Sequence, residues 1–193
     1  KIFNYFKIKT FACDKNKQAI KKINKKKINL IHYNINMKKK KFKNKFDIIL
    51  MLDVIEHIKN DKRFLNDSLF HLKKGGIAII NVPAVNSLYS KYDKLIGHIK
   101  RYKKQDLTQI INKNENKILK HFYWGISLIP VLIIRKIMTD YILKFNSNDE
   151  VIEFGWKTGF FSKFMLKILS FERYLNINFP MGSSLMCVIR KQK

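Results

Sequence analysis

The chain has 193 residues, of which 46% are hydrophobic, and 40 Lys and Arg against 14 Asp and Glu give it a net charge of +26. This length fits one domain, and the hydrophobic content excludes a wholly disordered chain. Only five of the basic residues are arginine, and the lysines are spread over the whole chain. Because readers of nucleic-acid sequence favour arginine for forked contacts to bases and phosphates, we expect no specific nucleic-acid partner.

The cysteines and the hydropathy of the chain further limit the kinds of protein that the sequence can encode. Cys13 and Cys187 lie at opposite ends of the sequence, so neither a disulfide framework nor a zinc site is indicated, and we expect a cytoplasmic protein. The longest apolar stretch, residues 122–134, is shorter than the roughly 20 residues that a membrane-spanning helix needs. We expect it to be a core or interfacial segment.

The first part of the chain alternates between two sequence patterns. Continuous apolar runs predict strands, and segments with apolar residues on one face and lysines on the other predict helices. Strands are expected over residues 9–13, 28–33, 46–52 and 77–82, with helices over 15–27 and 61–72, the second closed by Gly75 and Gly76. The link 33–46 is too short to require a full helix. This order predicts an α/β domain with a largely parallel sheet.

The rest of the chain is richer in predicted helices. After Pro83 we expect a loop with a short helix over 87–97, then a helix over 105–112 and a strand over 117–124. Two helices with apolar faces follow over 126–145 and 160–175, before a last strand over 184–190. The two long helices either pack together as a lid or lie on a membrane surface.

Asp14 directly follows the first predicted strand. In a βαβ unit that binds a nucleotide, an acid at this place accepts hydrogen bonds from the ribose, about 20 residues beyond a glycine-rich turn. None of the seven glycines forms a GxG pattern, so the turn that matches Asp14 would lie before residue 1. Alternatively, Asp14 caps the helix that follows.

Two blocks, FDIILMLDVIEHIK at 46–59 and LKKGGIAIINVP at 72–83, carry a family resemblance. They resemble the fourth- and fifth-strand blocks of class I S-adenosylmethionine-dependent methyltransferases, and the likeness continues through 92–107 and 180–191. The resemblance implies a Rossmann-like sheet, truncated at its N-terminus, with a helical insertion before the last strand. It implies one domain over 1–193: a partial cofactor core (1–83), an acceptor-binding or lid region (84–182) and the final strand (183–193).

The resemblance also implies a cofactor site for S-adenosyl-L-methionine. Asp14 would hold the ribose, and Asn34 or Asn36, after the next strand, would meet the adenine. Leu52 and Asp53, at the end of the strand 46–52, would face the cofactor across the crevice at the carboxyl ends of the strands. Without its glycine turn, the chain 1–193 is expected to bind the cofactor weakly.

The acceptor side is expected around a histidine and a later polar segment. His57 would act as general base or position the acceptor, or else it is a helix-start histidine bonded to the backbone. The pentad from Asp53 to His57 has one histidine, so no metal is expected. His98, Arg101 and Tyr102 would bind the acceptor, although Arg101 could equally pair with Asp93 or Asp106.

These features predict O- or C-methylation of a small-molecule or lipid-linked acceptor, with peripheral membrane contact as an added feature. The base-methylating signatures are missing: no Asn/Asp-Pro-Pro-aromatic turn follows the strand 46–52, and no proline precedes either cysteine. The alternative is a basic protein that binds membranes or nucleic acid without catalysis.

Overall fold

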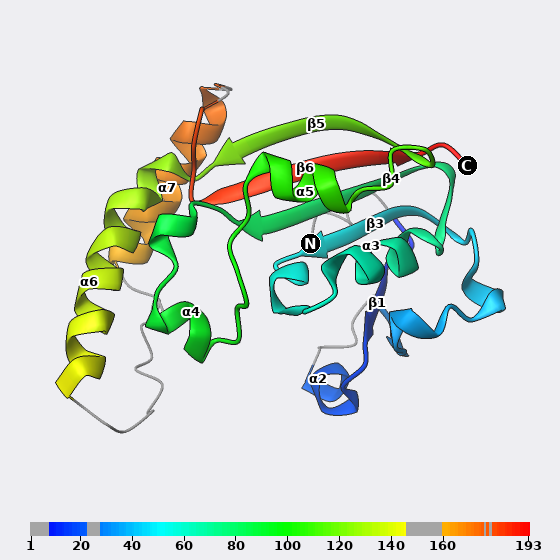
Figure 1. Ribbon diagram of the computed structural model, residues 1–193, viewed down its shortest axis with the longest axis horizontal. Helices are drawn as coiled ribbons and strands as arrows, with labels where there is room; N and C mark the ends of the chain where they lie inside the picture. Colours follow the sequence, from blue (N-terminus) through cyan, green and yellow to red (C-terminus); the bar gives the residue numbers. More distant parts are fainter. Residues whose placement is uncertain (1–7, 23–27, 146–159, 176, 178) are drawn as a thin grey trace.

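A computed structural model describes residues 8–22, 28–145, 160–175, 177 and 179–193 (Figure 1). Its strands are β1 (Phe11–Asp14), β2 (Asn29–His32), β3 (Phe46–Leu52), β4 (Leu72–Pro83), β5 (Asn116–Trp124) and β6 (Ser184–Lys191). Its α-helices are α2 (Lys17–Lys22), α3 (Asp61–Leu69), α4 (Lys91–Leu95), α5 (Lys104–Ile110), α6 (Ile129–Phe145) and α7 (Phe160–Tyr174). Short 3-10 turns η1 (Ile35–Met37), η2 (Lys40–Phe42), η3 (Ile55–His57), η4 (Asn86–Leu88) and η5 (Ile126–Leu128) complete the described chain.

The strands form two sheets. β1 and β2 pair in parallel, and a second sheet has the order β3-β4-β6-β5. Within it β3 and β4 are parallel, whereas β6 runs antiparallel to both β4 and β5. The predicted strands and the mixed α/β class are confirmed. The carboxyl ends of β3 and β4 therefore meet at one edge, next to the segment that carries α4 (Figure 1).

The break between the two sheets falls between β1 and β3. The rings of Phe11 and Phe46 still meet edge to face, with centroids 5.5 Å apart, but the two strands do not pair. The side chains of Ile48, Leu50 and Leu52 on β3 are 57%, 42% and 49% exposed. Apolar side chains on one face of a strand favour burial, so this face of β3 is left without a covering layer within the described chain.

The core lies under the other face of the second sheet, where α3 and α5 pack (Figure 1). Leu65 of α3 and Leu107 of α5 are fully buried, and burial of each such side chain stabilises the fold by about 1.5–3 kcal/mol. Met51 of β3, with Ala78 and Ile80 of β4, supplies the facing surface. This packing fixes the ends of β3 and β4, from which the candidate site is built.

One predicted boundary is wrong. The helix expected over 61–72 ends at Leu69, and Leu72 to Gly76 open β4 instead of closing the helix. Leu72 is fully buried as the strand partner of Phe46, and an apolar residue at that place satisfies either periodicity. The expectation of a largely parallel sheet holds only in part, because β6 runs antiparallel to both β4 and β5. The 33–46 link contains only two 3-10 turns, as expected, and the helix expected over 15–27 is seen over 17–22, with 23–27 outside the described residues.

Glu172 of α7 ties that helix to the start of α6. Its carboxylate accepts hydrogen bonds from the backbone N–H groups of Gly125, Ile126 and Ser127 and from the Ser127 hydroxyl, at 2.5–3.1 Å. Gly125 has a left-handed φ of 73°, which turns the chain out of β5. The Glu172 carboxylate therefore caps the turn η5 and joins α6 and α7 at one end of the sheet.

We predict that Glu172→Gln lowers the free energy of unfolding by about 2 kcal/mol, because hydrogen bonds to a charged acceptor are lost. Burial alone would raise the pKa of Glu172, but the bonds from Ser127, Ile126 and Gly125 outweigh it and hold that pKa below 4.5. The carboxylate's contribution is thus complete above pH 4.5 and is lost as the pH falls through the lowered value.

Denaturant unfolding at several pH values checks this prediction, with Glu115→Gln as the control at an exposed glutamate. The stability difference between wild type and Glu172→Gln should shrink on acidification. A difference that is absent at neutral pH, or equal to that of the control, would contradict it.

Candidate active site

The candidate site begins where β3 ends. Asp53 takes a left-handed backbone conformation, with φ of 53°, which turns the chain sharply after Leu52. Its N–H donates to the carbonyl of Asn81 on β4 at 3.0 Å, and the Asn81 amide donates back to the Asp53 carboxylate at 2.9 Å. The Trp124 indole N–H donates to the Asn81 side-chain oxygen at 2.9 Å. Asn81, which sequence reasoning gave no role, thus positions Asp53 from the neighbouring strand.

Glu56 follows one turn later and is fully buried. Neither of its carboxylate oxygens has a hydrogen-bond partner. Burial, with a smaller contribution from the charge of Asp53, raises the pKa of Glu56 to about 7. The sequence alone gives Glu56 no role, since no pattern distinguishes a buried carboxylate from a solvated one.

His57 and His98 lie edge to face, with ring centroids 4.7 Å apart. The Nδ1 atom of His57 lies 3.0 Å from the Gly97 carbonyl, and that of His98 lies 3.0 Å from the Asp93 carboxylate. Both partners can only accept, so each Nδ1 carries a proton, and in the neutral form of each ring Nε2 presents a lone pair. The structure therefore brings these two sequence-predicted residues together, beside Glu56.

Asp93 holds the far side of the site. Its buried carboxylate accepts hydrogen bonds from Ser90, His98 and Arg101, at 3.0–3.1 Å. Burial alone would raise the pKa of Asp93, but the bonds from His98, Arg101 and Ser90 prevail and lower it to about 2. The sequence indicates Asp93 only as one of two partners for Arg101, because the distance between Asp93 and His98 in space cannot be read from the sequence.

Arg101 and Tyr102 are both buried in the protein. Arg101 makes a two-pronged contact with Asp93 and donates to the Ala84 carbonyl at 3.1 Å. Of the alternatives left open for Arg101, the ion pair with Asp93 is the one that the structure shows. The fully buried Tyr102 hydroxyl donates to Asp61 at 2.9 Å and to the Ile55 carbonyl at 3.2 Å, and burial with the Asp61 bond raises its pKa.

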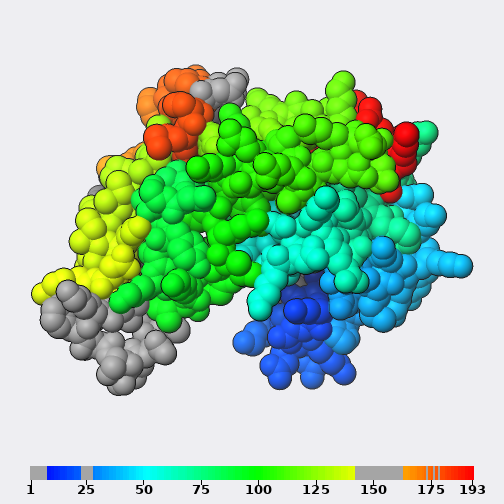
Figure 2. All heavy atoms as spheres, in the orientation of Figure 1, coloured from blue at the N-terminus to red at the C-terminus, as the bar shows by residue number. Residues whose placement is uncertain are grey.

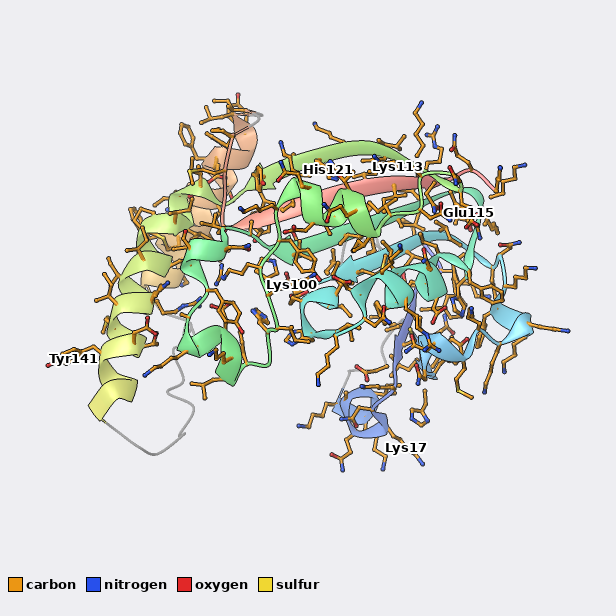
Figure 3. The ribbon with its side chains drawn as sticks, in the orientation of Figure 1. Lys17, Lys100, Lys113, Glu115, His121 and Tyr141 are labelled. Carbon is orange, nitrogen blue, oxygen red and sulfur yellow. The ribbon has the colours of Figure 1, made fainter. Side chains whose placement is uncertain are left out.

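Asp61 contacts both the Tyr102 hydroxyl and the Lys100 ammonium. Its Oδ2 lies 2.7 Å from the Lys100 ammonium, which also lies over the Tyr102 ring at 4.7 Å. Burial of Asp61 would raise its pKa, but the contacts with Lys100 and Tyr102 lower it. Lys100 is labelled in Figure 3, in the segment between α4 and α5. These contacts make Arg101 and Tyr102 the supports of the loop that presents His98.

The predicted cofactor residues lie at the ends of the first two strands and of β3. Asp14 is exposed at the end of β1 and accepts from the Asn16 N–H at 2.6 Å, while Asn16, not Asp14, caps α2 through Gln18. Asn34 caps η1 by accepting from the Asn36 N–H at 3.1 Å.

A nucleoside fits these groups in part. The exposed carboxylates of Asp14 and Asp53 can accept from ribose hydroxyls, and exposed Leu52 offers an apolar surface beside them. Figure 2 shows a recess on this side, between the dark blue β1–α2 segment and the green α4 segment. None of the seven glycines provides a GxG turn for the methionine end of the cofactor.

Comparison with known proteins agrees with this geometry. A family model for a methyltransferase domain matches residues 2–121. A SAM-dependent methyltransferase from Archaeoglobus fulgidus has a TM-score of 0.58 at 14% identity, over 98% of this chain and 79% of that one. The YcgJ protein of Bacillus subtilis has a TM-score of 0.53 at 10% identity, over 96% of this chain and 83% of that one. Coclaurine N-methyltransferase, solved with N-methylheliamine and SAH, has a TM-score of 0.54 at 10% identity, over 97% of this chain and 62% of that one. No curated protein sequence matches the chain.

The chain belongs to the methyltransferase-domain family, whose model covers more than half of it. The expected class I S-adenosylmethionine-dependent methyltransferase, its Rossmann-like α/β fold and S-adenosyl-L-methionine as its cofactor are confirmed. The assignments of individual residues to cofactor and acceptor stay predictions.

We predict that Arg101→Lys lowers the free energy of unfolding by about 2 kcal/mol, since an ammonium cannot replace the fork that serves Asp93 and Ala84. Arg63→Lys is the matched control, because the Arg63 side chain is 69% exposed and lies 3.6 Å from Asp67. Its effect should stay within about 0.5 kcal/mol. Chemical denaturation measures both. A raised acceptor KM with unchanged stability in Arg101→Lys would contradict the supporting role.

Proposed function

We propose that this protein transfers the methyl group of S-adenosyl-L-methionine to a small-molecule or lipid-linked acceptor. The observation that carries the proposal is that Asp14 ends β1, and Asp53 and His57 follow β3, so that all three lie at the carboxyl ends of parallel strands in a chain of the methyltransferase-domain family. In open α/β sheets ligands bind at this edge. The acceptor would approach from the side of His57 and His98.

The cofactor supplies a methyl group that is already activated on a sulfonium. Alignment of the acceptor and exclusion of water then provide most of the rate, so the protein's own residues chiefly bind and orient. In this proposal Asp14 binds the ribose, Leu52 and Asp53 flank the adenosine, and Asn34 or Asn36 meets the adenine. His57 faces the acceptor with the lone pair of its Nε2, which suits a hydroxyl that must lose its proton.

The acceptor's lipid character is proposed from α6 and α7. Exposed apolar residues of α6 recur along one helical face, at Ile133, Ile134, Ile137, Met138 and Tyr141. Figure 3 shows Tyr141 projecting outward from α6. On α7 the residues Phe164, Leu166, Phe171 and Tyr174 are also exposed.

An apolar helix face on a protein of charge +26 suits the surface of an anionic membrane. No helix among the described residues is long and apolar enough to cross a membrane. We therefore propose that the protein works from the cytoplasm and contacts the membrane peripherally, with residues 84–182 as the acceptor-binding region.

We predict that Asp14→Ala weakens binding of S-adenosylmethionine at least tenfold, or roughly 1.4 kcal/mol, because charge-assisted hydrogen bonds to the ribose are lost. Isothermal titration calorimetry measures this on the longest native form of the protein that contains these residues. Asp47→Ala removes an exposed carboxylate from the amino end of β3 and should leave the affinity unchanged. Equal affinities of wild type and Asp14→Ala would refute the ribose assignment.

We also predict that the wild-type protein floats with vesicles containing phosphatidylglycerol. Ile137→Glu should weaken this binding roughly tenfold, because an apolar contact of about 1.5–3 kcal/mol is lost. Met37→Glu is the control: Met37 is 61% exposed, close to the 64% of Ile137, but lies in η1, and the change in charge is the same. Equal flotation of both variants would show that charge alone, and not the α6 face, governs binding.

A further inference from the structure

The least explained group in the described structure is the carboxylate of Glu56. It is fully buried, both of its oxygens lack a hydrogen-bond partner, and it lies beside the two histidines of the site. The Nε2 atom of His98 lies 3.9 Å from the Oε1 atom of Glu56, which is too far for a hydrogen bond. A buried carboxylate in this state costs stability unless a ligand satisfies it.

Glu56, His57 and His98 each offer one ligand atom, and these atoms lie within 4.8 Å of one another. Two imidazoles and one carboxylate form a donor set that binds divalent transition metals and leaves further positions open. At metal–ligand bond lengths of about 2.0–2.2 Å, two ligand atoms at a tetrahedral angle lie roughly 3.4 Å apart. The 3.9 Å between Glu56 and His98 and the 4.8 Å limit for the cluster both exceed that separation, so the side chains must move by roughly 0.5–1.4 Å to close on a metal ion. The exposed side chain of His57 can make such a shift.

Both histidines are already held as metal ligands are held. Metal-binding histidines commonly donate their other ring N–H to a carbonyl or a carboxylate, which fixes the tautomer and the orientation of the ring. Here the Gly97 carbonyl holds Nδ1 of His57, and Asp93 holds Nδ1 of His98. The lone pair on each Nε2 is therefore available to a cation.

The charges around the cluster also favour a cation. Asp53 precedes Glu56 by three residues, and the Asp93 carboxylate lies 3.0 Å from Nδ1 of His98. Of the nearby basic side chains, Arg101 pairs with Asp93 and Lys100 with Asp61, while the Arg135 guanidinium lies over the Tyr92 ring. Glu56 in the cluster and Asp93 beside it therefore give a cation two acidic neighbours.

We propose that Glu56, His57 and His98 bind a divalent transition-metal ion, of the kind of Mn²⁺ or Zn²⁺, that holds the hydroxyl oxygen of the methyl acceptor. The identity of the acceptor as a hydroxyl compound rests on the proposed methyltransferase function. The metal site itself rests only on the three side chains and their partners.

A bound metal ion acts as a Lewis acid that lowers the pKa of a coordinated hydroxyl. The acceptor hydroxyl gives its proton to water, and its oxygen forms the new bond to the methyl carbon. The bond from sulfur to that carbon breaks, and its electron pair stays on sulfur, which becomes a neutral thioether. His57 would then serve as a ligand rather than as the general base, because one Nε2 lone pair cannot do both.

Titration of the metal-free full chain with Co²⁺ tests this proposal through the visible absorption of the bound ion. Wild type should bind one equivalent saturably, and Zn²⁺ should displace it. Glu56→Gln and His57→Ala should each weaken binding at least 30-fold; Glu56→Gln preserves the buried shape, and circular dichroism confirms folding. His32→Ala is the control, because His32 is an exposed histidine at the end of β2, bonded to the Lys15 carbonyl.

The absence of saturable binding in wild type would overturn the proposal, as would equal losses in His32→Ala and His57→Ala. Methyl transfer that proceeds undiminished in a chelator would overturn the catalytic role of the metal, while leaving the proposed function intact. Metal binding that depends on Glu56 and His57 supports the site even where no methyl transfer is found, in which case only the proposed function fails.

Discussion

The site depends on one buried carboxylate, that of Asp93. It accepts from Ser90 at the start of α4, from His98 after that helix, and from Arg101 before α5. A carboxylate removed from water is costly unless its partners replace the lost hydration, and here a full guanidinium and two further donors do so. Because these partners come from consecutive turns, Asp93 folds the whole segment between β4 and α5 against the sheet, and thereby sets His98 opposite His57.

The pairing of the strands also explains why the polar residues of the site lie close together. Parallel pairing of β3 with β4 places Asp53 and Glu56 at the edge from which the loop with His98 departs. Asn81 locks Asp53 from the neighbouring strand, and Tyr102 fixes η3 through the Ile55 carbonyl. Rigid elements thus carry the acids, while exposed His57 and Leu52 face outward. The acidic residues of the site are therefore fixed in place, whereas His57 and Leu52 are accessible to solvent.

Sequence reasoning located most of the fold, for a physical reason. Strands buried in a sheet read as continuous apolar runs, so β3 and β4 were recognisable from their residues alone. The end of α3 was misplaced because Leu72 suits the inward face of either a helix or a strand. Single-residue roles were harder: Arg101 was correctly given two alternatives, but no periodicity reveals that Glu56 is buried without a partner, or that Asp93 contacts His98. Those facts depend on tertiary contacts between distant segments.

We propose that the carboxyl ends of β1 and β3 bind the adenosine of the methyl donor. A crystal structure with S-adenosylhomocysteine at saturating concentration tests this binding mode. We expect ribose hydroxyls on the Asp14 carboxylate and the adenosine beside Leu52 and Asp53, with the sulfur directed toward His57 and His98. Clear density for the ligand elsewhere on the protein, with Asp14 and Asp53 facing only solvent, would contradict it.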